Sequence, residues 1–455
     1  MTTWSRPPAT RAAAVATAAL ACLALGLTTA LPTASAGSDQ SGAAHAKPTK
    51  PKKDKHGDQG KDRNKNRVGK DVRFATFNAS LNRTTAGQLL TDLSSGSNVQ
   101  ARNVAETIQR SAPDVLLVNE FDYYPGGQAA ELFRDNYLAV SQHGAPAADY
   151  PYYYVAPSNT GVPSGFDLDN DGVVSAPGTL RYGNDAFGFG DFVGQYGMVV
   201  YSKYPIATDD VRTFQRFLWK DMPGALLPDD PATPEPADWY SPEELAVFRL
   251  SSKSHWDVPI ELAKNKTVHF LVSHPTPPTF DGAEDRNGLR NHDEIRFWAD
   301  YIGNQPTASY LYDDEGVAGG LHRGAKFVIA GDQNADPVDG DSVDDAILQL
   351  LDHPRIDTRR APTSEGAVEA AALQAGANLT HAGLVEQDTA DFNDNPAPGN
   401  LRVDYVLPRK GLKVLASEVF WPVKADPYYY LTGTFPFPTS DHRLVWVDVK
   451  LNHRH

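Results

Sequence analysis

The sequence predicts an α/β fold in which two packed β-sheets are covered by helices on their outer sides. From residue 71 onward, short apolar and β-branched segments alternate with loops rich in Gly, Pro and Asp, a pattern typical of strands. Most of these segments are apolar on both faces, which indicates sheets that are covered on both sides. No internal repeat and no second domain are evident, so residues 71–455 are predicted to form one domain.

The predicted strands follow one another along the whole domain. They are Val72–Phe77, Val115–Asn119, Tyr152–Val155, Met198–Tyr201, Val268–Ser273, Phe327–Ala330, Arg402–Leu407, Leu415–Phe420 and Leu444–Val449. Helical spacing of apolar residues predicts helices over Val99–Arg110, Asp293–Ile302 and Val343–Leu351. Residues 209–254 are rich in Pro and Asp and are predicted to form a long surface insertion.

The N-terminus has the order of a secretory signal peptide. Arg6 and Arg11 precede the apolar stretch Ala12–Leu27, and a small-residue A-x-A triplet ends at Ala36. We therefore expect residues 1–36 to be removed and the protein to be secreted, as an extracellular protein. A membrane anchor is less favoured, because a spanning helix needs about 20 apolar residues, so we expect no stable insertion into a membrane.

Residues 37–70 are rich in Lys, Asp, Asn, Gly and Pro without apolar periodicity, and they are predicted to be a disordered basic linker. Residues 1–70 contain 12 of the 42 Lys and Arg and 4 of the 57 Asp and Glu, which leaves 30 basic and 53 acidic side chains and a formal net charge of −23 for residues 71–455. Such an acidic body argues against broad electrostatic capture of nucleic acid. The only cysteine, Cys22, lies in the predicted signal peptide, so the mature domain must be stable without disulfides.

Acidic, amide and imidazole side chains recur where the predicted strands end or begin. They are Asn78, Glu120, His274, Asp332, Asn334, Asp404, Asp441 and His442. A lone Asp or Asn after a strand is usually a turn former, but turn formation alone does not explain such a series. Since α/β proteins place their sites at strand ends, the series indicates a functional site.

The series resembles the endonuclease/exonuclease/phosphatase superfamily, which includes DNase I-like nucleases, inositol-polyphosphate phosphatases and sphingomyelinases. The most specific motifs are Gly331-Asp332-Gln333-Asn334, Arg402-Val403-Asp404-Tyr405 and Ser440-Asp441-His442. The resemblance implies a four-layer α/β sandwich, with two mostly antiparallel sheets packed face to face and helices outside. It also implies that residues 71–455 are a catalytic domain that hydrolyses phosphoester bonds with a divalent metal.

The resemblance also implies a role for each side chain. Glu120 would be the principal ligand of Mg²⁺ or Mn²⁺, supported by Asn78 and Asp441, because a hard cation with oxygen ligands offsets the charge of a phosphate ester. His442 would stabilise the charge of the transition state, and Asp404 would orient it.

The resemblance further implies that Asp332 orients or deprotonates the attacking water, that Asn334 binds a phosphate oxygen or the metal shell, and that His274 contacts phosphate. DNase I-like members carry a carboxylate before the central strand that supports this second histidine. The corresponding segment here, residues 194–198, contains no acid. We therefore interpret His274 as a phosphate binder rather than a general acid.

Two charged segments leave alternatives open. Asp167, Asp169 and Asp171 have the acid spacing of a calcium loop, but Gly178 stands at the twelfth position where an EF-hand needs Glu. A structural Ca²⁺ site and a plain Asp-rich turn are equally favoured.

The second charged segment carries Arg286 and Arg290, which lie at a predicted helix start. They would either clamp the substrate phosphate or form surface salt bridges. The aromatic segments Tyr428–Tyr430 and Phe435–Phe437 would stack on a ring of the substrate or fill the core, and core packing is favoured.

We expect a monomeric enzyme whose substrate is a small or non-polymeric phosphate ester, because the domain is acidic and poor in Lys and Arg. An extracellular DNase or RNase, with nucleic acid as substrate, is the first alternative. A sphingomyelinase-like enzyme follows, since no aromatic hairpin for entering a membrane is evident. A non-catalytic protein that binds phosphate ligands on the same scaffold is disfavoured, because every motif residue is present.

Overall fold

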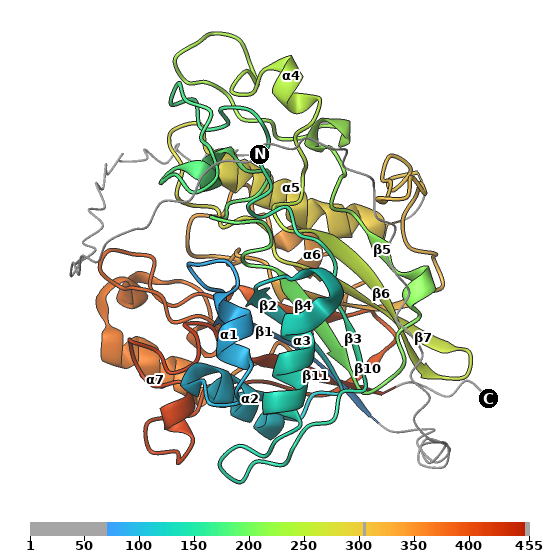
Figure 1. Cartoon of the computed structure of the whole chain (residues 1–455), viewed down its shortest axis with the longest axis vertical. Coiled ribbons are helices and arrows are strands. Elements are labelled where there is room, and N and C mark those ends of the chain that lie inside the picture. The colour runs from blue at the N-terminus through green and yellow to red at the C-terminus, as the bar shows by residue number, and fades with distance from the viewer. Residues whose placement is uncertain (1–70, 304–305, 451–455) are drawn as a thin grey trace, which may run out of the picture. The chain divides into compact units, whose positions relative to one another are not determined.

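The computed structural model describes residues 71–303 and 306–450, which form two β-sheets with helices around them (Figure 1). The predicted signal peptide and linker lie outside these residues. The six-stranded sheet has the order β10-β11-β1-β2-β4-β3 and consists of β1 (Val72–Leu81), β2 (Val115–Phe121), β3 (Tyr152–Tyr154), β4 (Met198–Ser202), β10 (Lys413–Val419) and β11 (Val445–Lys450). The five-stranded sheet follows chain order and consists of β5 (Arg212–Thr213), β6 (His255–Ala263), β7 (Lys266–Ser273), β8 (Lys326–Asp332) and β9 (Asp404–Pro408).

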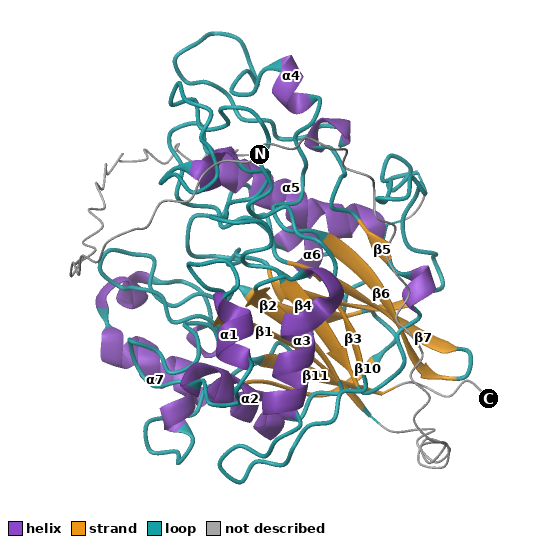
Figure 2. Ribbon diagram, in the orientation of Figure 1, coloured by secondary structure: helices purple, strands orange, loops and turns teal. Residues whose placement is uncertain are grey.

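Neighbouring strands run antiparallel except for one pair in each sheet. β1 is parallel to β2, and β7 is parallel to β8. The α-helices are α1 (Gln88–Leu93), α2 (Val99–Ser111), α3 (Gln128–Phe133), α4 (Pro242–Leu245), α5 (Arg286–Tyr301), α6 (Leu348–Leu351) and α7 (Glu365–Gln374). Figure 2 shows α1, α2 and α3 gathered together and apart from α5. The predicted α/β sandwich with two mostly antiparallel sheets is confirmed.

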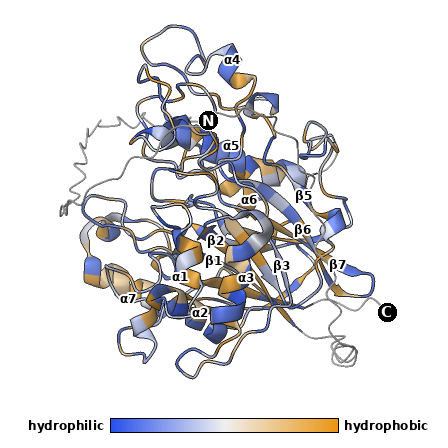
Figure 3. Ribbon diagram, in the orientation of Figure 1, coloured by the Kyte–Doolittle hydropathy of each residue, from blue (hydrophilic) through white to orange (hydrophobic). Residues whose placement is uncertain are grey.

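Three apolar cores separate four layers. Between the sheets, Phe74 of β1 meets Phe270 of β7 with ring centroids 5.5 Å apart. On its other side the six-stranded sheet packs against α1, α2 and α3, and the five-stranded sheet packs against α5. Figure 3 shows hydrophobic residues concentrated on the strands and on the helix sides that meet them.

Consecutive residues of one strand face different cores. Phe74 of β1 points between the sheets, whereas Ala75 points toward the helices. In β8, Val328 points between the sheets and Ile329 points toward α5. Because side chains alternate along a strand, a segment apolar at every position is covered on both faces, as the sequence indicated.

The predicted surface insertion at residues 209–254 was wrong. This segment contains β5 and α4, and it buries Phe214, Phe217 and Trp219 in the same core as α5. The prediction failed because it rested on the high Pro and Asp content of the segment and gave no weight to its aromatic residues. The helix predicted at Val343–Leu351 is also shorter than expected, since only α6 is α-helical.

The strand ends that carry polar side chains meet at one place. β1 contacts β8 and β9 across the two sheets, and β2 contacts β8. In the antiparallel pair β8–β9, Asp332 and Asp404 lie opposite each other. In the part of the chain that the structure describes, no helix is both long and apolar enough to cross a membrane.

Candidate active site

The two sheets each contribute side chains to one buried cluster. β1 supplies Asn78, β2 supplies Glu120, β8 ends on Asp332 and β9 begins on Asp404. His274 directly follows β7, and His442 lies shortly before β11. Residues that are distant in the sequence are therefore brought together by the packing of one sheet on the other.

Asn78 connects the carboxylates of the two sheets. Its Nδ2 donates hydrogen bonds of 3.0 Å to Glu120 Oε1 and of 3.0 Å to Asp332 Oδ2. Asn82 donates a further bond of 2.6 Å to Glu120 Oε2. Sequence reasoning missed Asn82, although a second amide four residues after Asn78 was a visible signal.

His442 and Asp404 form a hydrogen-bonded pair. His442 Nδ1 lies 2.9 Å from Asp404 Oδ2, and Thr389 Oγ1 donates to the same oxygen at 2.9 Å. Burial opposes the charged form of His442, but Asp404 and Asp332 outweigh it and hold the pKa of the imidazole well above its ordinary value. The structure thus favours a protonated His442. No sequence signal pointed to Thr389.

Asp332 lies at the centre of the cluster. Its Oδ2 is 3.4 Å from Nε2 of His274 and 3.7 Å from Nε2 of His442. Its Oδ1 accepts the backbone N–H of Asn334 at 2.8 Å. Burial raises the pKa of Asp332 to about 6, with His442 lowering it and Asp404 raising it. A carboxylate with this pKa can exchange a proton near neutral pH.

No acid supports Nδ1 of His274 among the described residues. Its Nδ1 is buried and has no hydrogen-bond partner among the described residues. Burial, together with the positive charges of Lys253 and His442, holds the pKa of His274 well below its ordinary value. In the segment without an acid, Gln195 instead bonds Asp191 and Arg83. A neutral imidazole suits the predicted role as a phosphate binder.

The proposed metal ligands fit a hard divalent cation. Burial raises the pKa of Glu120, and the nearby carboxylates of Asp441 and Asp332 add to that effect. A cation held by carboxylate and amide oxygens would remove this repulsion. Ligand atoms of Asp332, Asp404 and His442 also lie within 4.8 Å of one another. Since His442 and Asp404 already bond each other, we place the metal on the Glu120 side.

The structure does not bring the predicted arginine clamp to this cluster. Arg290 is buried and donates to the backbone oxygens of Leu250, Phe187 and Arg249, at 2.8, 2.6 and 2.9 Å. Arg286 is paired with Glu284. Arg290 therefore holds loops together, and its predicted contact with phosphate is corrected.

The acidic loop is partly paired with an arginine. Arg181 pairs with Asp169 at 2.6 Å and with Asp171 at 2.9 Å. Asp167 accepts the backbone N–H groups of residues 171 and 172. The acids that converge are Asp167, Asp169 and Asp185, so the predicted member Asp171 is replaced by Asp185. Arg181 thus offsets part of the negative charge, while Asp167, Asp169 and Asp185 bring three ligand atoms within 4.8 Å of one another, and a structural Ca²⁺ at this loop stays a prediction.

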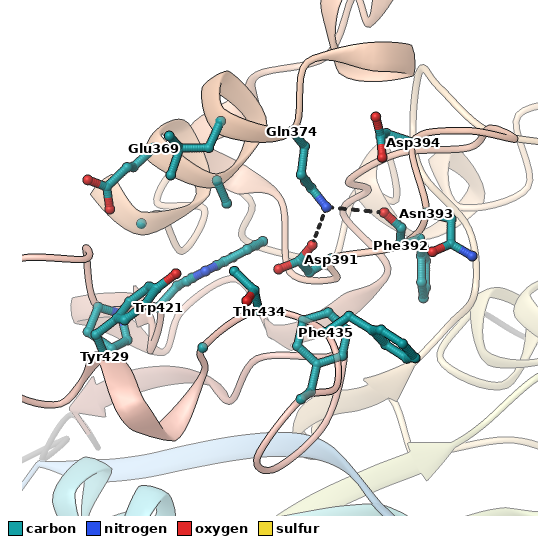
Figure 4. A pocket seen from close by; sticks show the side chains of 16 residues that line it. Glu369, Gln374, Asp391, Phe392, Asn393, Asp394, Trp421, Tyr429, Thr434 and Phe435 are labelled. Atoms are coloured by element: carbon teal, nitrogen blue, oxygen red, sulfur yellow. Dashed lines mark hydrogen bonds between the residues drawn. The ribbon is translucent and has the colours of Figure 1, made fainter.

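Figure 4 shows a pocket whose lining residues include two that contact the segment of His442. Asp391 and Phe392 line it. The backbone N–H of Asp391 donates to the oxygen of Asp441 at 2.8 Å, and the Phe392 ring meets the His442 ring edge-on at 5.3 Å. Trp421 and the exposed Phe435 also line the pocket, so part of the predicted aromatic segment does not fill the core. None of its described lining residues is Lys, Arg or His.

The sequence model of the endonuclease/exonuclease/phosphatase family matches residues 75–442. A search of curated proteins finds no match. Similar solved structures include an endonuclease/exonuclease/phosphatase from Beutenbergia cavernae, with 16% identity, coverage of 84% of this chain and 72% of that chain, and a TM-score of 0.44. Sphingomyelinase C from Streptomyces griseocarneus has 15% identity, covers 83% and 99%, and has a TM-score of 0.40. A Staphylococcus aureus beta toxin variant with bound magnesium ions has 15% identity, covers 83% and 99%, and also has a TM-score of 0.40.

Proposed function

The chain belongs to the endonuclease/exonuclease/phosphatase family, and from that premise we propose that it is a secreted, metal-dependent hydrolase of small phosphate esters. The observation that carries the proposal is the position of Asp332 between Asn78 and the His442–Asp404 pair. In the proposed reaction, Asp332 serves as a proton acceptor and His442 as a positively charged donor, and the two lie 3.7 Å apart in a buried site.

Each group has a distinct part in the proposed reaction. Mg²⁺ or Mn²⁺, when bound by Glu120, Asn78 and Asp441, would offset the charge of the phosphate. Asp332 accepts a proton from the attacking water, whose oxygen bonds to phosphorus while the bond from phosphorus to the ester oxygen breaks and the leaving alcohol takes a proton from solvent. Protonated His442 donates a hydrogen bond from Nε2 to a phosphoryl oxygen, where negative charge grows in the transition state.

The remaining groups bind and orient. Asp404 holds Nδ1 of His442, so that Nε2 carries the proton that faces the substrate. Asn334 and neutral His274 lie beside Asp332 and would donate to the other phosphate oxygens. Burial of these groups strengthens their interactions with an anion.

Charge supports a small ester rather than nucleic acid. Residues 71–455 carry a formal net charge of −23, and the pocket beside His442 has no basic residue among its described lining. A polynucleotide needs Lys and Arg along its backbone, whereas this pocket is lined by aromatic side chains and by the carboxyl groups of Glu369, Asp391 and Asp394. An extracellular nuclease remains the second candidate.

A substrate panel tests the proposal. The full chain would be assayed with Mg²⁺, Mn²⁺ or Ca²⁺ on bis-p-nitrophenyl phosphate, phytate, a sphingolipid, RNA and plasmid DNA, with His442→Ala as the inactive control. We expect small esters to be cleaved faster than plasmid DNA at low salt. Faster nicking of DNA would make the nuclease the leading function, and phosphate binding without turnover would indicate a binding protein.

Secretion is part of the same proposal and has its own test. N-terminal sequencing of protein recovered from the culture medium is expected to begin after Ala36. Full-length protein retained in the cell would contradict it.

A further inference from the structure

Lys253 is a buried lysine that none of the assigned roles uses, and its burial lowers the pKa of its ammonium group. It lies in the segment just before β6, and its side chain is 7% exposed. Its Nζ donates one long hydrogen bond, 3.4 Å, to the backbone oxygen of Pro275. No carboxylate of the described chain lies within 4 Å of it. An ammonium group has three donors, so this one is poorly satisfied.

The position of Nζ is inside the candidate active site. The oxygen of Pro275 that it contacts also accepts Nδ2 of Asn334 at 3.1 Å, and Pro275 directly follows His274. Lys253 therefore lies next to the two residues assigned to phosphate oxygens. Its charge also contributes to the lowered pKa of His274.

Glu294, whose negative charge acts on Lys253, is occupied by other donors. Glu294 accepts the backbone N–H of Ser252 at 2.7 Å, the hydroxyl of Ser252 at 3.1 Å and the backbone N–H of Thr276 at 2.7 Å. Glu294 thus ties together the two segments that flank Lys253. Its carboxylate stays satisfied whether or not the ammonium is present.

An unpaired buried charge is costly, and replacing it with an apolar side chain usually stabilises a protein. An unpaired buried positive charge is therefore expected at a place where a bound anion can pair with it. The domain is otherwise poor in cations at this place, because Arg290 and Arg286 are engaged elsewhere.

We propose that Lys253 is a phosphate-binding residue, whose Nζ donates to a non-bridging oxygen of the substrate phosphate beside Asn334 and His274. This inference rests on the proposed function and adds a lysine cation to a phosphate site whose other positively charged group is His442. Lys253 would act on the anion itself, independently of the organic substituent.

The test uses Lys253→Met, which keeps an unbranched side chain of similar length and removes the charge. Inorganic phosphate is titrated into the full-length protein by calorimetry, kcat/KM is measured on bis-p-nitrophenyl phosphate, and Tm is recorded. We expect phosphate affinity and kcat/KM to fall about 10- to 100-fold, the range for a hydrogen bond to a charged group. We also expect Tm to stay the same or rise.

Two further variants separate the explanations. Lys203→Met removes an equal charge from a lysine that pairs with Asp114 at 3.3 Å, and it should leave phosphate affinity unchanged. Lys253→Gln keeps a donor for Pro275 but no charge, and it should lose phosphate affinity like Lys253→Met.

Phosphate affinity of both Lys253 variants within threefold of the parent protein, or a lower Tm in both, would overturn the proposal, since a lower Tm would mark Lys253 as structural. If the parent protein itself neither binds phosphate nor cleaves any ester, the proposed function fails together with this inference. If the parent protein turns over and the variants match it, only the inference fails.

Discussion

Asn78 of β1 donates a hydrogen bond of 3.0 Å to Asp332 of β8, and this bond joins the two sheets at the candidate site. The same Nδ2 donates to Glu120, so one neutral side chain bridges the proposed metal ligand and the proposed proton acceptor. Asn78 Oδ1 accepts only a long bond of 3.3 Å from Ser80 N in the described structure, which leaves it available to a metal. The amide holds two buried carboxylates near each other without adding charge.

Removing this amide should therefore affect both stability and activity. In Asn78→Ala, two buried carboxylate oxygens lose their donor, and we expect a loss of about 1–3 kcal/mol in the free energy of unfolding. Turnover should fall at least about 100-fold, because Asp332 and Glu120 lose their fixed positions. Urea unfolding and kcat/KM measure the two effects. Asn82→Ala, which removes only one bond to Glu120, should lose less stability.

The metal prediction concerns Glu120. Glu120→Gln should nearly abolish turnover while the circular dichroism spectrum stays that of the parent protein. EDTA should inactivate the parent protein, and added Mg²⁺ or Mn²⁺ should restore it. Because burial raises the pKa of Glu120, protons compete with the metal, so metal affinity should weaken as pH falls. Full activity after exhaustive dialysis against EDTA would refute metal dependence.

The correction of Arg290 gives a third prediction. Arg290→Met leaves three backbone oxygens without their donor, so we expect a loss of roughly 2–4 kcal/mol in the free energy of unfolding. KM should change less than about twofold, since the guanidinium faces carbonyl oxygens and not substrate. Arg286→Met is the matched control and should have a smaller effect on stability. An unchanged Tm together with a raised KM would contradict this correction and would show that Arg290 contacts the substrate phosphate.

A fourth prediction concerns pH and Asp388, a buried carboxyl outside the site. Burial raises its pKa to about 8, helped by the charges of Asp336 and Asp339. The folded state then binds this proton more tightly than the unfolded state, so stability from this group is full below about pH 4 and is lost as pH rises toward 8. Asp388→Asn, which stays neutral, should be more stable than the parent protein at pH 8, by on the order of 1–3 kcal/mol. The difference should nearly vanish at pH 4, and thermal unfolding at both values measures it.

The sequence predicted the fold class and most strands because their signal is local. Val115 to Asn119, for example, is apolar at almost every position and ends on polar residues. β6 was missed because His255 and Asp257 look like exposed positions. Both are buried and bonded to residues from other elements, at 2.6 Å to Ser251 Oγ and 2.7 Å to Tyr301 OH. Such partners appear only after folding.

The residues of the candidate site also fall into those that the sequence predicted and those that it did not. Asp332, Asp404 and His442 stand in motifs that can be read from the chain, and the structure places them together. Lys253 and Thr389 carry no motif, because their positions depend on contacts with Pro275 and with Asp404, which are distant in the sequence. Arg290 was misassigned for the opposite reason. Its position at a helix start suggested an anion site, whereas tertiary packing turned it toward carbonyl oxygens.

The central claim is that Asp404 acts through protonated His442, and a double-mutant cycle tests it most directly. kcat/KM would be measured on one small ester for His442→Ala, Asp404→Asn and the double variant. Each single variant should lose activity by about two orders of magnitude or more, as expected for one positioned acid–base or charge-stabilising group. Because Asp404 Oδ2 contacts Nδ1 of His442 at 2.9 Å, the double variant should be hardly slower than His442→Ala alone. Losses that multiply in the double variant would show that the two residues act independently and would contradict the account.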